Sequence, residues 1–273
     1  MQNYATLYIM TTTYWNKQGS EPLFKELLWD KPENKLHAGK LLIIGGNVHS
    51  FAAPGAAYQA AGNAGVGVAK VLLPESLKKT VGNILENGEF APSNKSGSFS
   101  RNALNEWLSF GSWADGVLLP GDLGRNSETA IVLEQFITRH SGQITITQDA
   151  LDYFTSKPEA LLARPETTLI TSFAQLQKLS ISSHFMHAFT YDMPIATMVD
   201  NLHFFTIMHP ASIVLRHNGM FYVARDGEVA TTKVAPGEAM WRVETASYAA
   251  VWTLQNPSKA FAALTTAVFV LSE

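Results

Sequence analysis

The stretch LLIIGGNVHSFAAPGAAYQAAGNAGVGVAKVLLPE, residues 41–75, determines the fold class of this chain. KLLIIGG (40–46) is a short apolar run that two glycines end, as is typical of a buried parallel strand. Small residues recur at helical spacing between Pro54 and Ala64, which predicts a helix packed closely against a sheet. The remaining GVGVAKVLLPE is typical of a second strand, ended by Pro74. The stretch therefore predicts a strand–helix–strand unit of a parallel sheet.

The same alternation continues along the chain. Helices are predicted over residues 76–88, 101–113, 126–140, 151–157 and 172–180, and strands over 115–124, 142–150 and 167–172. Alternating strands and helices predict an α/β fold, in which a largely parallel sheet is covered by helices on both faces. In such folds, ligands bind at the carboxyl ends of the strands.

The last third of the chain has a different pattern. Residues 212–234 alternate like antiparallel strands, with Asn218-Gly219 at one turn and Asp226-Gly227 at the next. Two helices are predicted over 237–255 and 257–273. Residues 1–39 are expected to be an irregular N-terminal extension, apart from one short helix that ends by Pro32. Without a linker or an internal repeat, residues 1–273 are predicted to form one domain.

Composition limits the function classes. The chain has 273 residues, of which 46% are hydrophobic and 16% charged, and this composition builds a sizeable core. A formal charge of −3 without a basic run gives no reason to expect a nucleic-acid partner. The absence of cysteine excludes disulfides and cysteine–zinc sites. With no signal-peptide pattern and no apolar run of about 18 residues, no membrane association and a cytoplasmic location are expected.

Neither common phosphate-binding motif matches the opening stretch. A dinucleotide turn requires G-x-G-x-x-G and a P-loop requires G-x-x-x-x-G-K-[ST]. Here Gly45 and Gly46 are adjacent, and Asn47 follows them. From the residues alone, the favoured interpretation is that these glycines end a strand and that the alanines of the next helix permit close packing.

Residues 34–76 resemble the ADP/ATP-dependent NAD(P)H-hydrate dehydratases, a carbohydrate-kinase-like branch of the ribokinase-like superfamily. The resemblance extends in order over about 240 residues, through PGDLGRNSET (120–129) and ITQDAL (146–151). It implies a ribokinase-like three-layer sandwich. The matching residues are Lys35, Gly45, Gly46, Ala53, Pro54, Gly65, Gly67, Pro74, Glu75, Leu123, Gly124, Arg125, Glu128, Thr129 and Asp149.

The resemblance also implies a set of site residues. The implied substrate-binding residues are Gly46, Asn47, Ala53, Pro54, Leu123, Gly124 and Asp149, and the implied nucleotide-binding residues are Arg216 and Gly237. In the family, ADP or ATP phosphorylates a hydroxyl on a hydrated nicotinamide ring, and loss of phosphate restores NADH or NADPH. That reaction requires a base, donors for the phosphoryl group and a nucleotide pocket, and the family's base is an aspartate at a helix start.

The expected base is missing from its place. Counting back from Asn256-Pro257 puts Trp241 at the family's aspartate and Met240 at the preceding glycine. An indole only donates hydrogen bonds, so Trp241 cannot be a base. A shift of three residues would instead place Glu238 after Gly237.

Other family positions also differ here. The family's His-Pro-Gly-Glu is SFAQ, ending in Gln175 without a carboxylate, and its Lys-Gly is Arg216-His217. Asp122 stands where the family has glycine, and it could orient a ligand hydroxyl but would repel a pyrophosphate. His184 and His187 are three residues apart, yet a loop position is favoured over a metal site because no carboxylate pair accompanies them. No bound metal is predicted from the chain's own residues.

Two functional hypotheses remain open. The favoured one is a divergent homologue of the dehydratases with a degraded catalytic motif, weak or no dehydratase activity and retained binding of a nucleotide-like ligand. The alternative is an active ATP- or ADP-dependent dehydratase, a lyase, or a small-molecule kinase that uses Glu238 or Glu244 as its base. ADP or ATP with Mg²⁺ would be the cofactor and an NAD(P)H hydrate the substrate. A homo-oligomer is expected from the family resemblance and from the apolar final helices.

Overall fold

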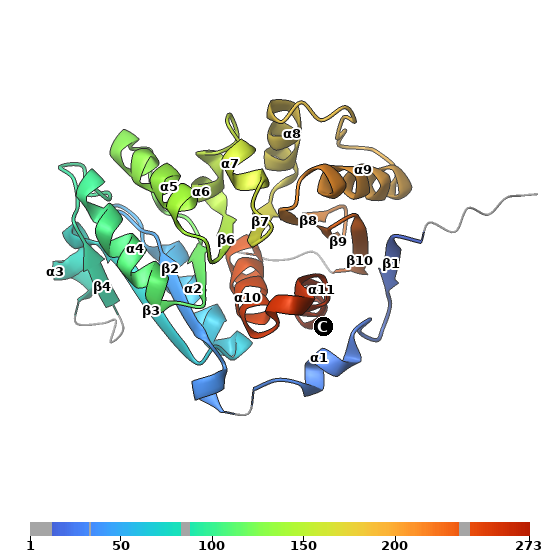
Figure 1. Cartoon of the computed structure of the whole chain (residues 1–273), viewed down its shortest axis with the longest axis horizontal. Helices are drawn as coiled ribbons and strands as arrows, with labels where there is room; N and C mark the ends of the chain where they lie inside the picture. The colour runs from blue at the N-terminus through green and yellow to red at the C-terminus, as the bar shows by residue number, and fades with distance from the viewer. Residues whose placement is uncertain (1–12, 33, 83–87, 235–240) are drawn as a thin grey trace, which may run out of the picture.

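A computed structural model of the chain describes residues 13–32, 34–82, 88–234 and 241–273. The described strands form one sheet in the order β1-β10-β9-β8-β7-β6-β5-β2-β3-β4 (Figure 1). Only β9 runs antiparallel to its neighbours among these strands. The strands are β1 (Trp15–Gln18), β2 (Lys40–Ile44), β3 (Val68–Pro74), β4 (Gly88–Ala91), β5 (Gly116–Leu119), β6 (Gln143–Thr147), β7 (Thr167–Thr171), β8 (Ser212–His217), β9 (Met220–Arg225) and β10 (Glu228–Lys233).

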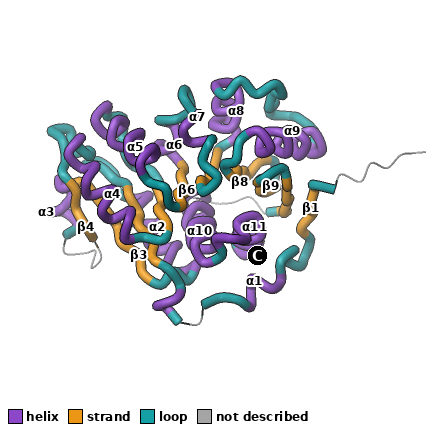
Figure 2. The backbone as a smooth tube through the Cα atoms, in the orientation of Figure 1, coloured by secondary structure: helices purple, strands orange, loops and turns teal. Residues whose placement is uncertain are grey.

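Helices cover both faces of this sheet (Figure 2). α2, α10 and α11 pack on one face, and α4, α6, α8 and α9 pack on the other. The helices are α1 (Lys25–Trp29), α2 (Ala52–Ala64), α3 (Lys78–Val81), α4 (Leu104–Trp113), α5 (Ser127–Arg139), α6 (Gln148–Asp152), α7 (Glu159–Leu162), α8 (Phe173–Ser182), α9 (Ile195–Met208), α10 (Trp241–Gln255) and α11 (Ala260–Val270). The predicted α/β class with a mostly parallel, doubly covered sheet is confirmed.

The alternation of side chains along β2 builds both layers of core. Leu42 and Ile44 enter one hydrophobic cluster with Trp107 of α4, whereas Leu41 and Ile43 enter the cluster shared with α2 and α10. These four apolar side chains of β2 are fully buried, whereas Lys40 at its start is exposed. Burial of each contributes about 1.5–3 kcal/mol relative to exposure. This is why the run at the start of the quoted stretch is continuously apolar rather than alternating.

The predicted hairpins are confirmed. β8 pairs with β9 and β9 with β10, both antiparallel. Asn218 and Asp226 have φ values of 47° and 51°, and Gly219 and Gly227 follow at 70° and 81°. Two successive left-handed residues match the twist of the flanking strands, which is the reason that Asn-Gly and Asp-Gly predict such turns.

The described part of the predicted irregular extension contains a strand as well as the predicted helix. β1 pairs in parallel with β10 at the edge of the sheet. Gln18 Nε2 donates to Thr232 Oγ1 at 2.8 Å and to the carbonyl oxygen of Thr265 at 3.2 Å. The helix α1 ends at Trp29, and its Leu27 is buried beside Trp252. These contacts join the first described residues to α10 and α11.

Three further elements, β4, α7 and α9, were not predicted from the sequence. β4 is a four-residue edge strand, and α9 has apolar residues on its exposed side as well as on its buried side. Phe204, Ile207 and Met208 are 45%, 58% and 55% exposed, so no apolar stripe at helical spacing marks α9.

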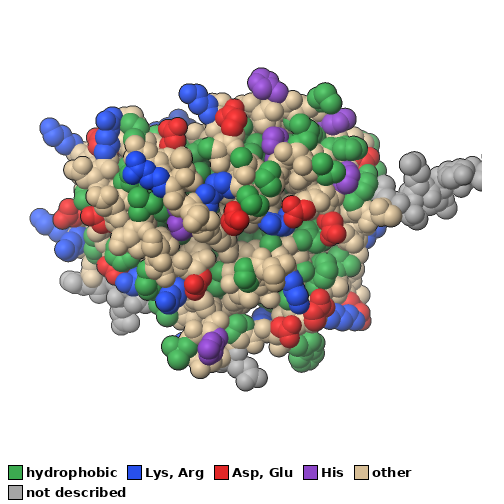
Figure 3. Space-filling model, viewed as in Figure 1, with side chains coloured by type: hydrophobic (Ala, Val, Ile, Leu, Met, Phe, Trp, Pro, Cys, Tyr) green, Lys and Arg blue, Asp and Glu red, His purple; other side chains and the backbone are tan. Residues whose placement is uncertain are grey.

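The charges on the surface and the burial of the final helix are relevant to the partners expected from the sequence. Lysine and arginine side chains are interspersed with acidic ones over the face in Figure 3. No helix within the described ranges is long and apolar enough to cross a membrane. The apolar residues of α11 are buried against the sheet and α1, so they leave little apolar surface for self-association. The homo-oligomer stays a prediction.

The turn after β2 provides a test of this packing. A Cβ at Gly45 would lie 2.5 Å from the carbonyl oxygen of Gly121 and 2.9 Å from Pro54 Cγ. We therefore expect Gly45→Ala to lower the free energy of unfolding by about 1–3 kcal/mol, as overpacking does. Gly55→Ala is the matched control, since a Cβ there meets no atom within 4 Å. In urea unfolding the control should be neutral or stabilised by up to about 1 kcal/mol. Equal stability of the two variants would contradict the close approach.

Candidate functional site

A cavity of about 340 Å³ lies at the carboxyl ends of the strands, where the turns after β2, β5 and β6 meet. Its lining residues are Ala52, Ala53, Asp122, Gln148 and Asp149. Ligands of open α/β folds bind at this edge of the sheet. The cavity is therefore the candidate site.

The residues that the family resemblance implies for substrate binding lie around this cavity, but only some of them line it. Ala53 and Asp149 line the cavity, while Pro54 and Leu123 are buried beneath it. Gly46 and Gly124 belong to the turns, with φ values of 87° and 73°. The amide nitrogen of Gly46 donates to the carbonyl oxygen of Gly121 at 3.3 Å, which joins the turn after β2 to the turn after β5.

Asp122 accepts a hydrogen bond from the first turn of helix α2. It has a φ of 59°, and its Oδ2 accepts a hydrogen bond of 2.7 Å from the amide nitrogen of Ala53. Its carbonyl oxygen accepts from Asn47 Nδ2 at 2.7 Å. A carboxylate at a helix N-terminus is stabilised by the helix dipole by about 0.3–1 kcal/mol. The chain's own side chain thus satisfies a donor that an anionic ligand would otherwise use.

Asp149 is half-buried at the start of α6. Its Oδ2 accepts from the amide nitrogen of Gly124 at 3.0 Å, and its Oδ1 is buried without a hydrogen-bond partner among the described residues. Burial raises the pKa of Asp149, and the nearby charge of Asp122 raises it further, although the bond from Gly124 acts in the opposite direction. The carboxyl group therefore favours its protonated form more than an exposed aspartate does.

Sequence reasoning missed Tyr153. Its hydroxyl donates to the carbonyl oxygen of Gly124 at 2.5 Å and accepts from the amide nitrogen of Asn126 at 3.1 Å. These bonds hold the turn that carries Gly124 against α6. Nothing in the local sequence LDYFTSK indicates this contact, because its partners lie 27 and 29 residues away.

On the other side of the site, Trp241 packs against the chain itself. The indole is half-buried and meets the ring of Phe221 edge to face, with 5.9 Å between ring centroids. The guanidinium of Arg216 lies 5.8 Å from the centroids of both rings. A cation over aromatic faces is attracted by their quadrupoles. Gly237, Glu238 and Met240 lie outside the described residues.

The orientation of Glu244 does not support its role as a base. Its neighbour in the first turn of α10, Arg242, donates from Nη1 to Gln175 Oε1 at 3.1 Å and so faces the strand ends. Two residues further on, Glu244 lies about 200° around the helix axis from Arg242. Its side chain is exposed.

Gln175 is the centre of a buried hydrogen-bond network rather than a replacement acid. It is 5% exposed and forms a capping box with Ser172 at the start of α8. Its Nε2 donates to the carbonyl oxygen of Gln148 at 2.8 Å and to Asp152 Oδ1 at 2.7 Å. Burial lowers the pKa of Arg242, and the charge of Asp152 opposes that effect. The network joins the starts of α6, α8 and α10.

Sequence reasoning also missed Arg242. A cation in the first turn of a helix opposes the helix dipole, and that unfavourable placement was the signal available in the sequence. Its hydrogen bond to Gln175 spans 67 residues, so the sequence could not name the partner.

His184 and His187, which could have shared a helix face, lie in the loop after α8. A loop is the position that the sequence favoured for them. His184 has a φ of 56°, and His187 stacks on Phe204 with 5.4 Å between ring centroids. Within the described ranges, no group of three or more histidine, aspartate or glutamate side chains is placed to hold a metal ion.

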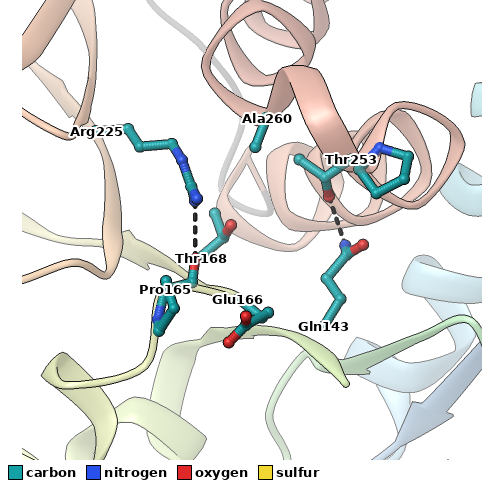
Figure 4. Close-up of a pocket in the computed structure, with 8 residues that line it drawn as sticks. Gln143, Pro165, Glu166, Thr168, Arg225, Thr253 and Ala260 are labelled. Atoms are coloured by element: carbon teal, nitrogen blue, oxygen red, sulfur yellow. Dashed lines mark hydrogen bonds between the residues drawn. The ribbon is translucent and has the colours of Figure 1, made fainter. Parts of the chain in front are cut away.

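A second cavity, of about 150 Å³, lies at the opposite edge of the sheet (Figure 4). There Arg225 donates to the carbonyl oxygen of Pro165 at 2.8 Å and to Ser212 Oγ at 2.9 Å. Gln143 Nε2 donates to Thr253 Oγ1 at 2.5 Å. These hydrogen bonds join the amino ends of the strands to the end of α10. Arg225 and Gln143 are thus already paired within the chain, and we do not take this cavity as a candidate ligand site.

Solved structures share this architecture. A ribokinase-like superfamily protein from Enterococcus faecalis V583 matches with a TM-score of 0.70 at 16% identity, covering 95% of this chain and 87% of its own. A hypothetical protein from Streptococcus mutans matches with a TM-score of 0.65 at 18% identity, covering 91% and 86%. The ADP/ATP-dependent NAD(P)H-hydrate dehydratase from Bacillus subtilis, co-crystallised with ATP and Mg²⁺, matches with a TM-score of 0.62 at 12% identity, covering 92% and 87%.

This chain therefore has the ribokinase-like fold. At such identities the likeness establishes the fold and not the activity. No protein-family model matches the sequence, and no curated protein matches it.

The raised pKa of Asp149 gives a prediction about stability and pH. The pKa of Asp149 is higher in the folded state than in the unfolded state, where it is about 3.9. The stability that its protonated form contributes is therefore complete below the unfolded pKa and is lost as pH rises through the folded pKa. We therefore expect Asp149→Asn to gain stability over the wild type as pH rises from about 4 through the raised pKa of the folded state. Thermal unfolding at several pH values measures this difference, with Asp226→Asn, in the exposed β9–β10 turn, as the control for one lost charge. A constant difference across the range would contradict the argument.

Proposed function

We propose that this protein binds a nucleotide-like small molecule at the carboxyl edge of its sheet and has little or no NAD(P)H-hydrate dehydratase activity. The observation that carries the proposal is the packing of Trp241 against Phe221 and Arg216 at the start of α10. The family resemblance places the catalytic base at that position.

The described start of α10 offers no proton acceptor toward the strand ends. Trp241 is a donor only, Arg242 is a cation, and Glu244 points away from the sheet. Gln175, at the position of a family carboxylate, is neutral and already hydrogen-bonded. Loss of a general base costs about 10²–10⁴ in rate. This supports weak or absent turnover.

The same edge retains features that suit a nucleotide. Arg216 carries a guanidinium, whose planar donors suit phosphate, beside two aromatic rings. Arg242 adds a second cation on this side of the site. The fold neighbour from Bacillus subtilis was co-crystallised with ATP and Mg²⁺. ADP or ATP is the proposed ligand, and Mg²⁺ would enter on its phosphates, since this ion commonly keeps several waters and few protein ligands.

The catalytic half of the proposal is tested with hydrated NADH. Purified protein with ATP or ADP and Mg²⁺ should not restore absorbance at 340 nm, because no base faces the strand ends from the described start of α10, where the family resemblance places it. Clear turnover would contradict the proposal. If Glu238→Gln then abolished that turnover, the result would support the alternative of an active dehydratase or small-molecule kinase that uses Glu238.

The binding half is tested by thermal shifts with ADP, ATP, NADH and NADPH. A ligand at a hundred times its Kd stabilises the fold by about 2.7 kcal/mol, so saturating ligand should raise the Tm clearly. Arg216→Ala should weaken the shift by removing the cation beside the rings. Arg139→Ala, at the exposed end of α5, is the matched control and should leave the shift unchanged. No shift with any of the four ligands would overturn the binding proposal.

A further inference from the structure

We propose that the outer face of α9 binds a second copy of this chain and forms a two-fold dimer. The surface consists of Phe204, Ile207 and Met208 of α9 with Met186 and His187 of the loop after α8, and we call it the α9 patch. The sequence pointed to the final helices for self-association, but α11 is buried within the chain. The candidate ligand cavity is lined by other elements, so this inference does not rest on the proposed function.

Exposed apolar side chains concentrate in this part of the surface. Of the thirteen large apolar side chains that are exposed within the described ranges, seven lie between residues 181 and 208. Hydrophobic and histidine side chains gather over α8 and α9, at the upper right of Figure 3. Single exposed apolar residues are normal on a protein surface, whereas a cluster of them marks an interaction surface.

The α9 patch is continuous. Phe204, Ile207 and Met208 are three and four residues apart, so the helix places them side by side. The ring of Phe204 stacks on that of His187, with 5.4 Å between ring centroids and 20° between planes, and this contact extends the surface to the exposed Met186. The opposite side of α9 is already packed in the core. An apolar face therefore remains after the core contacts of α9 are complete.

Helix α5 shows that such exposure is not a general property of this surface. It packs into the same core cluster as α9, through Val132 and Phe136. Its exposed residues are all polar, namely Ser127, Glu134, Gln135, Thr138 and Arg139. α5 thus has the polar outer face that a surface helix of a monomer has, and α9 does not.

The scarcity of charge around α9 favours a second copy as the partner. Apart from histidines, only Asp192 and Asp200 are ionisable among the 37 residues from 179 to 215. Asp200 already accepts a hydrogen bond of 2.7 Å from the hydroxyl of Tyr14. A two-fold axis brings the same surface of both subunits together, so charges near the axis would repel their own copies. A patch without charges avoids that repulsion.

Other occupants need features that this region lacks. An anionic membrane surface attracts lysine and arginine, and residues 179–215 contain neither. A charged protein partner needs opposite charges to pair with. Phenylalanine and methionine, by contrast, are enriched in protein–protein interfaces, from which lysine and glutamate are depleted.

Sedimentation velocity over a hundredfold range of protein concentration tests the proposal. Wild type should shift from the mass of one chain to twice that mass as concentration rises. Met208→Glu and Phe204→Glu should each raise the Kd of the dimer at least about tenfold, because each copy brings the new charge into the same contact. Leu36→Glu is the matched control, since Leu36 is also exposed but lies outside the α9 patch. A wild type that stays monomeric, or a dimer that both patch variants keep, would overturn the inference.

A mixture of two variants tests whether the partner is the same face of another copy. Met208→Glu and Met208→Lys, mixed in equal amounts, should associate more tightly than either variant alone, because the mixed dimer pairs opposite charges. Equal association of the mixture and of the separate variants would contradict a shared face. Circular dichroism checks that each variant folds, and Met208 is at the exposed end of α9, where a charge is tolerated.

Oxidative footprinting of the wild type identifies the occupant without any substitution. Met186 and Met208 should become protected from hydroxyl radicals as protein concentration rises, while the exposed Trp29 stays reactive. Protection of both methionines in a monomeric protein would point to a segment of the same chain, such as residues 1–12, and would overturn the inference. So would sedimentation of the wild type with vesicles of phosphatidylcholine and phosphatidylglycerol that Met208→Glu abolishes.

Discussion

The turns that follow β2 and β5 can meet because Gly45 has no side chain. Its Cα faces the carbonyl oxygen of Gly121 so closely that a Cβ would lie 2.5 Å from it. This approach brings Asp122 within hydrogen-bond reach of α2. The position of the Asp122 carboxyl group at the cavity thus depends on one missing methyl group.

The site has two chemically different halves. Asp122 and Asp149 make one half acidic, whereas Arg216, Trp241 and Arg242 make the other half basic and aromatic. Gln175 lies between them, since it accepts from Arg242 and donates to the turn at the start of α6. An amide can serve both sides, because it is a donor and an acceptor at once. A carboxylate at this position could accept from Arg242 but could not donate to a carbonyl oxygen.

The sequence allowed the fold to be predicted because its signals are local. The apolar run before Gly45 and the Asn218-Gly219 turn each determine their own conformation within a few residues. β1 was missed because its residues WNKQ show no apolar alternation, and its pairing with β10 joins distant parts of the chain. α9 was missed because exposed apolar residues hide its period.

Less of the site could be predicted, because most of its contacts join residues that are far apart in the sequence. The turn residues Gly124 and Asp149 belong to local motifs, and their positions follow from those motifs. The partners of Gln175 and Tyr153 are separated from them by up to 67 residues, so only the folded chain reveals them. Glu244 could not be assigned to a face until the direction of Arg242 was known, because two residues along a helix reverse the direction of a side chain.

The pairing of β1 with β10 has a consequence for how the chain is made. Gln18 and its partner Thr232 are 214 residues apart, so β1, the first strand of the described residues, completes the edge of the sheet among the last. At about 5–20 residues per second, β1 waits roughly 10 to 40 seconds for its partner. During synthesis, the strands from β2 to β8 can associate first, and β1 then pairs with β10 at the edge of a sheet that is already largely assembled.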